Sequence, residues 1–188
     1  MNRAFTSVKV VVREPAVQTS TVLFESRKFR IVRRAALGRD GAPRTFDVID
    51  HRGAIVVLPL LDDGRIVLIR NERPAVGESL LELPAGTLDA GEEPIACARR
   101  ELTEETGYRA GRLRPLLTFY TTPGMTNERM HAFVAEELSP GQASPEPDER
   151  IEPVATTWDD ALDAIRDGRI ADGKTIATLL YYRCFASR

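Results

Sequence analysis

The stretch from Gly86 to Tyr108, "GTLDAGEEPIACARRELTEETGY", constrains the fold more than any other part of the chain. It begins as a loop, and from Pro94 onward its apolar residues recur at helical spacing. Proline is well suited to the first turn of a helix, and Gly107 is well placed just beyond the end of one. The sequence therefore predicts a loop followed by a helix over 94–106.

Three glutamates lie near the C-terminal end of this helix, where the helix dipole disfavours negative charge. Glu101 and Glu105 are one turn apart on the same face and repel each other, and Glu104 lies beside them. The three carboxylates can converge within several ångströms. A hard divalent cation such as Mg²⁺ or Mn²⁺ would relieve the repulsion, because such cations prefer oxygen ligands. A solvated acidic face is the alternative that these residues alone leave open.

The flanks of the helix complete a longer pattern that runs without a gap from Gly86. It reads Gly, five residues, Glu92, seven residues, Arg100-Glu101-Leu102, one residue, Glu104-Glu105, one residue, Gly107 and an apolar Tyr108. This pattern resembles the signature of the Nudix hydrolases, and every defining position is filled. The resemblance implies an α/β fold, specifically an α/β/α sandwich with a mixed central sheet. It also implies a reaction in which water attacks a diphosphate joined to another moiety.

The resemblance also implies roles for individual residues. The expected ligands of Mg²⁺, with Mn²⁺ also possible, are Glu101, Glu105, Glu104 and the backbone carbonyl of Ala85. Glu104 is alternatively an orienting acid, and it belongs to the expected catalytic set together with Arg100, whose guanidinium would hold the glutamates in position. The remaining positions of the signature are expected to be structural: Gly86, Glu92 and Gly107.

Features outside the signature resemble one branch of the family, the ADP-ribose pyrophosphatases. They are the segment "LLELPAGTLDAGEEP", Pro123 at sixteen residues after Gly107, and the segments "LIRNERPAVGES" and "DGKTIATLL". The implied reaction is Mg²⁺-dependent hydrolysis of ADP-ribose, or a related nucleoside diphosphate sugar, to a nucleoside monophosphate and a sugar phosphate. GDP-mannose or another sugar nucleotide is an alternative substrate. A non-catalytic sensor of ADP-ribose or a nucleotide is a further alternative, although sensors commonly lose the glutamates retained here.

Three more residues are candidates for the site. Arg73 occupies the position of a phosphate-contacting arginine in similar enzymes, and a surface ion pair is the alternative. Glu82 is a candidate for substrate or metal binding, with a solvated acid at a hairpin end as the alternative. Glu149 is the candidate general base or extra metal ligand, in an acidic run where Pro147 replaces a common acid. Its alternative is an exposed charged loop.

The first fifty residues contain short runs of strand-forming residues rather than helical patterns. These runs are Val8–Val12, Thr21–Phe24, Phe29–Val32 and Thr45–Ile49. They predict a small antiparallel N-terminal β-layer over residues 1–50, ahead of a Nudix domain over 51–188. The resemblance implies that these strands pair with, or swap onto, a second subunit, so we expect a homodimer with the substrate at its interface.

The strongest hairpin signal is the apolar run Ala54–Leu61, which meets Arg65–Arg70 across Asp62-Asp63-Gly64. We expect this hairpin to lie in the central sheet. Further strands are predicted at Leu80–Leu83, closed by Pro84-Ala85-Gly86, and at Leu113–Tyr120 and Met130–Glu136. An exposed, mobile loop is predicted over 138–149, and helices are predicted over Trp158–Arg166, with Thr156 or Thr157 as its cap, and over Lys174–Phe185.

The composition of the chain limits the classes of molecule that it can be expected to bind. The 188 residues carry 26 basic and 28 acidic side chains, which leaves no electrostatic footprint for nucleic acid or an anionic membrane. A small nucleoside diphosphate is the expected partner. Cys97 and Cys184 are expected to be buried thiols in a reducing compartment. Because the N-terminus lacks a secretory apolar run and no stretch is long enough to span a bilayer, a cytoplasmic protein is expected.

Overall fold

The computed structural model describes residues 19–26, 29–144 and 150–187. The chain divides into two compact units, Met1–Ile49 and Asp50–Arg188, and each is described by itself. The strand predicted at Val8–Val12 lies outside the described residues. In the described part of the chain, no helix is long and apolar enough to cross a membrane.

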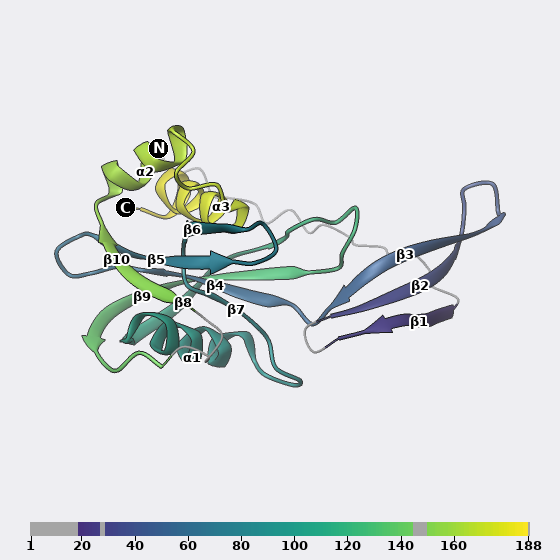
Figure 1. Ribbon diagram of the computed structural model, residues 1–188, viewed down its shortest axis with the longest axis horizontal. Helices are drawn as coiled ribbons and strands as arrows, with labels where there is room; N and C mark the ends of the chain where they lie inside the picture. The colour runs from purple at the N-terminus through teal and green to yellow at the C-terminus, as the bar shows by residue number, and fades with distance from the viewer. Residues whose placement is uncertain (1–18, 27–28, 145–149, 188) are drawn as a thin grey trace, which may run out of the picture. The chain divides into compact units, whose positions relative to one another are not determined.

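The first unit contains one three-stranded sheet in the order β1-β2-β3 (Figure 1). Its strands are β1 (Thr19–Glu25), β2 (Phe29–Leu37) and β3 (Pro43–His51), and β1 and β2 pair antiparallel. The predicted antiparallel layer is therefore present, with each strand longer than its sequence pattern indicated. Among the described residues of this sheet, Val32 alone is buried.

The second unit contains two sheets. A four-stranded sheet has the order β7-β4-β9-β8, and a three-stranded sheet has the order β10-β5-β6. The strands are β4 (Ala54–Pro59), β5 (Ile66–Arg73), β6 (Glu78–Glu82), β7 (Ala85–Thr87), β8 (Tyr108–Tyr120), β9 (Arg129–Pro140) and β10 (Ile151–Thr156). The helices are α1 (Pro94–Thr106), α2 (Trp158–Arg166) and α3 (Gly173–Tyr181), and a π-helical turn, η1, follows at Tyr182–Ala186. Because β4 pairs parallel with β9 and antiparallel with β7, the larger sheet is mixed, as predicted.

Strand β4 lies at the centre of this unit, and its side chains alternate between two cores. Val56 and Leu58 belong to a cluster that includes residues of α2 and α3. Ile55 and Val57 point the other way, into a cluster that includes residues of α1. Every residue of β4 is buried because both faces of the strand are covered. Figure 1 shows α1 on one side of the sheets and α2 with α3 on the other, which confirms the predicted α/β/α sandwich.

Helix α1 has the predicted bounds. Pro94 stands in its first turn, and Gly107 at its end adopts a left-handed φ of 72° and donates its N–H to the carbonyl of Thr103 over 2.9 Å. That conformation is readily available only to glycine, so the residue that ends the helix also sets the direction of the chain into β8.

The hairpin after β4 differs from the prediction. Its turn forms, with the N–H of Gly64 donating to the carbonyl of Leu61 over 2.9 Å. However, a single bridge between Leu60 and Ile66 joins the two arms, and β4 and β5 belong to different sheets. The prediction that the hairpin lies within one central sheet is therefore wrong. A strand has two edges, and those of β4 are occupied by β7 and β9.

The ends of other elements also differ from the predictions. Residues 138–140, predicted as part of an exposed loop, continue β9, where Tyr108 is paired with Pro140. Ala85 and Gly86, predicted with Pro84 to close a strand, instead belong to the short strand β7. Strand β10 was not predicted.

The C-terminal helices follow the predicted pattern, except that the helix predicted over Lys174–Phe185 ends as α3 at Tyr181 and gives way to the π-helical turn η1. Helix α2 begins after Thr157, whose side chain caps it by accepting the N–H of Asp160 over 3.1 Å. Cys97 is buried as expected, whereas Cys184 is exposed because it lies in the π-helical turn at the surface.

Candidate active site

The loop between β7 and α1 contacts two of the three signature glutamates. A Cβ atom placed on Gly86 would lie 2.0 Å from the Oε1 and Cδ atoms of Glu101, so the carboxylate occupies the space that any side chain would need. Glu105 is 3% exposed, and its Oε2 accepts the N–H of Ala85 over 2.9 Å. The fold therefore brings the carboxylates of Glu101 and Glu105 to the same two-residue stretch of backbone.

Arg100 links the loop to the helix. Its Nε and Nη2 atoms donate to the carboxylate of Glu92 over 3.0 Å each. Its Nη1 donates to Glu101 over 2.7 Å and to Glu104 over 3.0 Å. The hydrogen bond from Arg100 holds the pKa of Glu92 at about 2, and the same bond raises the pKa of Arg100. One guanidinium thus contacts three carboxylates at the loop-to-helix junction and offsets only part of their negative charge.

The donor chemistry of this junction fits a hard divalent cation. Carboxylate and carbonyl oxygens are the ligands that Mg²⁺ and Mn²⁺ prefer. The Cys97 thiol also lies at the junction, where its sulfur accepts Nη2 of Arg100 over 3.4 Å. The close approach of Glu101 to Gly86 supports the fit, because it places carboxylate oxygen beside bare backbone. Within residues 19–26, 29–144 and 150–187, no three His, Cys, Asp or Glu side chains already form a complete metal-binding group. Arg100 instead engages two of the glutamates.

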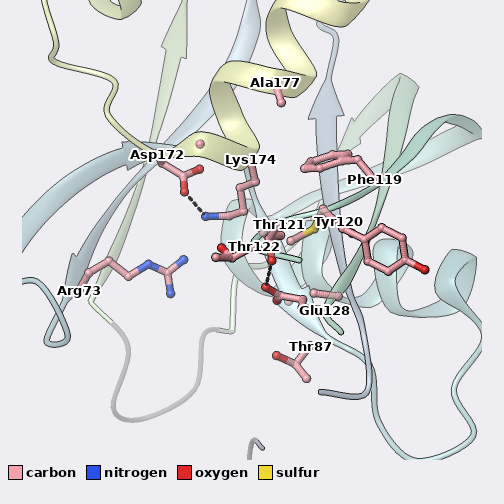
Figure 2. Close-up of a pocket in the computed structure, with 15 residues that line it drawn as sticks. Arg73, Thr87, Phe119, Tyr120, Thr121, Thr122, Glu128, Asp172, Lys174 and Ala177 are labelled. Carbon is pink, nitrogen blue, oxygen red and sulfur yellow. Dashed lines mark hydrogen bonds and ion pairs between the residues drawn. The ribbon is translucent and has the colours of Figure 1, made fainter. Parts of the chain in front are cut away.

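A pocket of about 620 Å³ opens onto this loop (Figure 2). Ala85 and Gly86 line it, so the carboxylates of α1 lie next to the cavity. Its other walls come from the ends of β5 and β8, the loop before β9 and the start of α3. The volume is within the range of small-molecule sites in proteins. The remaining lining residues are Ala54, Arg73, Thr87, Phe119, Tyr120, Thr121, Thr122, Glu128, Met130, Asp172, Gly173, Lys174 and Ala177.

Arg73 and Glu82 form one ion pair at the pocket wall. Arg73 donates to both carboxylate oxygens of Glu82, over 2.8 and 2.7 Å, and this bond raises the pKa of the arginine. Glu82 is 1% exposed, so the alternative of a solvated hairpin-end acid is wrong. Burial raises its pKa, but Arg73 and Lys174 outweigh that effect and leave the pKa below its usual value.

Lys174 is a pocket residue that the sequence reasoning missed. Its amino group contacts Glu82 and lies 3.0 Å from a carboxylate oxygen of Asp172, as Figure 2 shows for the second pair. Lys174 and Glu82 are 92 residues apart in the sequence, so no local pattern links them. The only available signal was the resemblance of the segment "DGKTIATLL" to related enzymes.

The loop between β8 and β9 supplies the opposite wall. Glu128 faces the pocket and accepts the hydroxyl of Thr121 over 2.6 Å (Figure 2). Asn127 ties this loop to the start of the second unit, since its Oδ1 accepts the N–H of His51 over 2.7 Å and its Nδ2 donates to Asp50 over 3.0 Å. Sequence reasoning had identified only Pro123 in this loop. The proposed base Glu149 lies outside the described residues.

The chain resembles known proteins over about seven tenths of its length. The model of the NUDIX domain matches residues 50–179. An ADP-ribose pyrophosphatase from Bacillus subtilis (strain 168) is 39% identical over 137 residues, which are 72% of this chain and 74% of that protein. A GDP-mannose pyrophosphatase from Citrobacter koseri is 39% identical over 152 residues, covering 72% of this chain and 79% of that protein.

A solved structure described as an ADP compounds hydrolase superposes with a TM-score of 0.78 at 23% identity. The superposition covers 92% of this chain and 94% of that one, and at this identity it supports the fold alone. The family match includes the loop, the three glutamates and the walls of the pocket. The fold, the arrangement of the signature and the identity to two pyrophosphatases agree, and the chain belongs to the Nudix family of hydrolases.

Proposed function

We propose that this protein hydrolyses the pyrophosphate bond of ADP-ribose, or of a related nucleoside diphosphate sugar, with Mg²⁺ or Mn²⁺ as cofactor. The observation that carries the proposal is a pocket of about 620 Å³ lined at one side by Ala85 and Gly86, the backbone that Glu105 and Glu101 contact, and at another by Arg73 and Lys174. Such a pocket offers oxygen ligands for cations and N–H donors for phosphate oxygens. The identity to an ADP-ribose pyrophosphatase supports this choice of substrate.

The cations would be held by Glu101, Glu104, Glu105 and the carbonyl of Ala85. When bound, they neutralise phosphate oxygens and lower the pKa of a bound water. Arg100 contacts Glu101 and Glu104, so its role would be to hold these carboxylates in position. Gly86 leaves room for Glu101, and a side chain there would displace the carboxylate.

The proposed reaction is the cleavage of the bridging P–O bond by one water molecule. The oxygen of water forms a bond to one phosphorus, the bridging P–O bond breaks, and the bridging oxygen leaves as part of the other phosphate. One product is a nucleoside monophosphate and the other is a sugar phosphate. Arg73 and Lys174 would bind the negative oxygens, and the rings of Phe119 and Tyr120 would offer a surface on which a planar base can stack.

Glu149 is proposed as the general base that takes the proton from water. A carboxylate in this role should give an acid limb in the pH dependence of kcat. The substitution Glu149→Gln should lower kcat and flatten the acid limb of the pH dependence. A pH–rate profile equal to that of the wild type would remove Glu149 from the mechanism.

GDP-mannose is the second candidate substrate, because the identity to a GDP-mannose pyrophosphatase equals that to the ADP-ribose enzyme. The test is a panel of ADP-ribose, GDP-mannose, UDP-glucose and ATP, assayed with Mg²⁺ for released monophosphate. The proposal predicts the highest kcat/KM for ADP-ribose. A higher value for GDP-mannose would transfer the assignment to that substrate, and hydrolysis of ATP alone would overturn both.

A homodimer formed through the first unit is also proposed. Its sheet exposes several large apolar side chains, namely Val22, Leu23, Phe24, Phe29, Leu37 and Phe46. Three strands with so little buried surface are marginal in water, so a covering partner would stabilise them. Sedimentation should give twice the mass of the chain, and Phe24→Glu should lower it. A wild-type monomer at micromolar concentration would overturn this proposal.

A reducing compartment such as the cytoplasm is the proposed location, supported by the two free thiols Cys97 and Cys184.

A further inference from the structure

Glu82, at the end of β6, is a buried carboxylate with no role in the proposed chemistry. It is 1% exposed, although an isolated buried carboxylate costs several kcal/mol. Its Oε1 accepts Nε of Arg73, and its Oε2 accepts both Nη2 of Arg73 and the amino group of Lys174. Both oxygens are therefore occupied by cations, which keeps the group ionised inside the protein.

The two cations that meet on Glu82 come from distant parts of the chain. Arg73 ends β5 and Lys174 stands in the first turn of α3, and both line the pocket whereas Glu82 does not. Their side chains are 36% and 14% exposed, so both remain accessible from the pocket while Glu82 lies behind them. Two cations that contact the same carboxylate repel each other. The carboxylate attracts both cations, which outweighs their repulsion, and its hydrogen bonds set where each one points.

A second link fixes the same geometry. Lys174 also contacts Asp172, whose carboxylate caps α3 by accepting the N–H of Thr175 over 2.9 Å and its hydroxyl over 2.6 Å. The hydroxyl oxygen of Thr175 in turn accepts the N–H of Leu83 over 2.8 Å. Leu83 directly follows Glu82, so the end of β6 and the start of α3 are joined both at Lys174 and at Thr175.

This arrangement argues against a direct role for Glu82. A carboxylate that binds a metal or a sugar hydroxyl needs a free oxygen directed at the ligand, and both oxygens of Glu82 already accept charged hydrogen bonds. We propose that Glu82 is a positioning residue that holds Arg73 and Lys174 side by side, so that both can donate to the phosphate oxygens of one substrate. The inference rests on the proposed function and extends it to a group that never touches the substrate.

The first test is Glu82→Gln, which keeps the shape of the side chain and removes its charge. We expect KM for ADP-ribose to rise by about tenfold and kcat to change by less than about threefold, because substrate binding is weakened while the chemical step is largely unaffected. The Mg²⁺ concentration at half-maximal rate should stay the same. The matched control is Glu78→Gln, at an exposed glutamate on the same strand, which should keep the wild-type KM. A changed Mg²⁺ requirement with an unchanged KM would make Glu82 part of the metal site and overturn the proposal.

A double-mutant cycle tests whether Glu82 acts through Lys174. If it does, the double variant Glu82→Gln with Lys174→Met should have a KM that exceeds the wild-type KM by much less than the product of the two single effects. Independent, multiplicative effects would overturn the proposal. Should Glu82→Gln not fold, Glu82→Asp still answers the question, because it keeps the buried charge but withdraws the carboxylate from Arg73 and Lys174 by one methylene, so KM should still rise. An unchanged KM in that variant would also overturn it.

Binding of inorganic pyrophosphate, measured by calorimetry without substrate turnover, separates this inference from the proposed function. Glu82→Gln should weaken pyrophosphate binding by about tenfold, whichever sugar nucleotide the enzyme prefers. If the wild type hydrolyses no sugar nucleotide, but Glu82→Gln still binds pyrophosphate about tenfold more weakly than the wild type, the proposed function fails and the positioning role stands. If the wild type hydrolyses ADP-ribose and Glu82→Gln matches it in pyrophosphate binding and KM, the positioning role fails alone.

Discussion

The two units of the chain are both rich in strands, yet they bury their side chains very differently. In β4 of the second unit every residue is buried, whereas in the described sheet of the first unit Val32 alone is. A sheet covered on both faces carries its own core, and a sheet exposed on both faces needs a partner to be stable. All described residues of the proposed site also lie in the second unit. The proposed chemistry and the larger core therefore belong to one unit, and the proposed assembly belongs to the other.

The largest expected effect concerns the chemistry of the second unit. Replacing Glu105 by glutamine should lower kcat by about a hundredfold to a thousandfold, because a proposed metal ligand loses its charge. The amide oxygen can still accept the N–H of Ala85, so thermal unfolding should change little. Asp163→Asn, at a half-exposed side chain on α2, is the control and should keep full activity. Near-normal turnover by Glu105→Gln would remove this residue from the metal site.

The next effect compares the cores of the two units. Leu68 in β5 is fully buried, and Leu68→Ala should lower the free energy of unfolding by about 2–5 kcal/mol. Leu37 in β2 is 56% exposed, and Leu37→Ala should cost less than about 0.5 kcal/mol in dilute protein. Denaturant titration at two protein concentrations measures both. The loss in Leu37→Ala should grow with concentration if a second copy covers the sheet. Equal losses at every concentration would remove the contrast between the units.

A smaller effect compares ion pairs at acidic pH. The pKa of Glu92 is about 2 in the folded protein against 4.5 for the free group, so its pairing with Arg100 stabilises the fold above pH 4.5. This contribution is lost as the pH falls from 4.5 towards 2. Between pH 6 and pH 3 the wild type should therefore lose about 1–3 kcal/mol more stability than Glu92→Gln. Urea titrations in the presence of a chelator measure the difference.

The matched ion pair in the first unit joins Arg33 and Asp47, whose side chains are each 50% exposed. The hydrogen bond from Arg33 lowers the pKa of Asp47, but water and salt screen an exposed pair. Asp47→Asn should therefore leave the acid sensitivity of the protein unchanged at physiological salt. An acid-sensitivity difference as large as that of Glu92→Gln would remove the contrast between the two ion pairs.

The fold and the site were not equally readable from the sequence. Helix α1 was predicted with its bounds because Pro94 and Gly107 act locally on the backbone. The assignment of β4 and β5 to one sheet was wrong because an apolar run indicates a buried strand but not which strands occupy its edges. Lys174 was missed for a related reason. Its contact with Glu82 joins positions 92 residues apart, and such a contact exists only once β6 and α3 have come together.

The most direct test of the account is one assay of the wild-type protein with ADP-ribose, in which both products are quantified while Mg²⁺ is titrated. The account predicts equal amounts of adenosine monophosphate and ribose 5-phosphate, a rate that rises with Mg²⁺ and then saturates, and no product after chelation. Calorimetry on the same preparation measures ADP-ribose binding. Binding without either product at any Mg²⁺ concentration would contradict the account and identify the protein as a sensor.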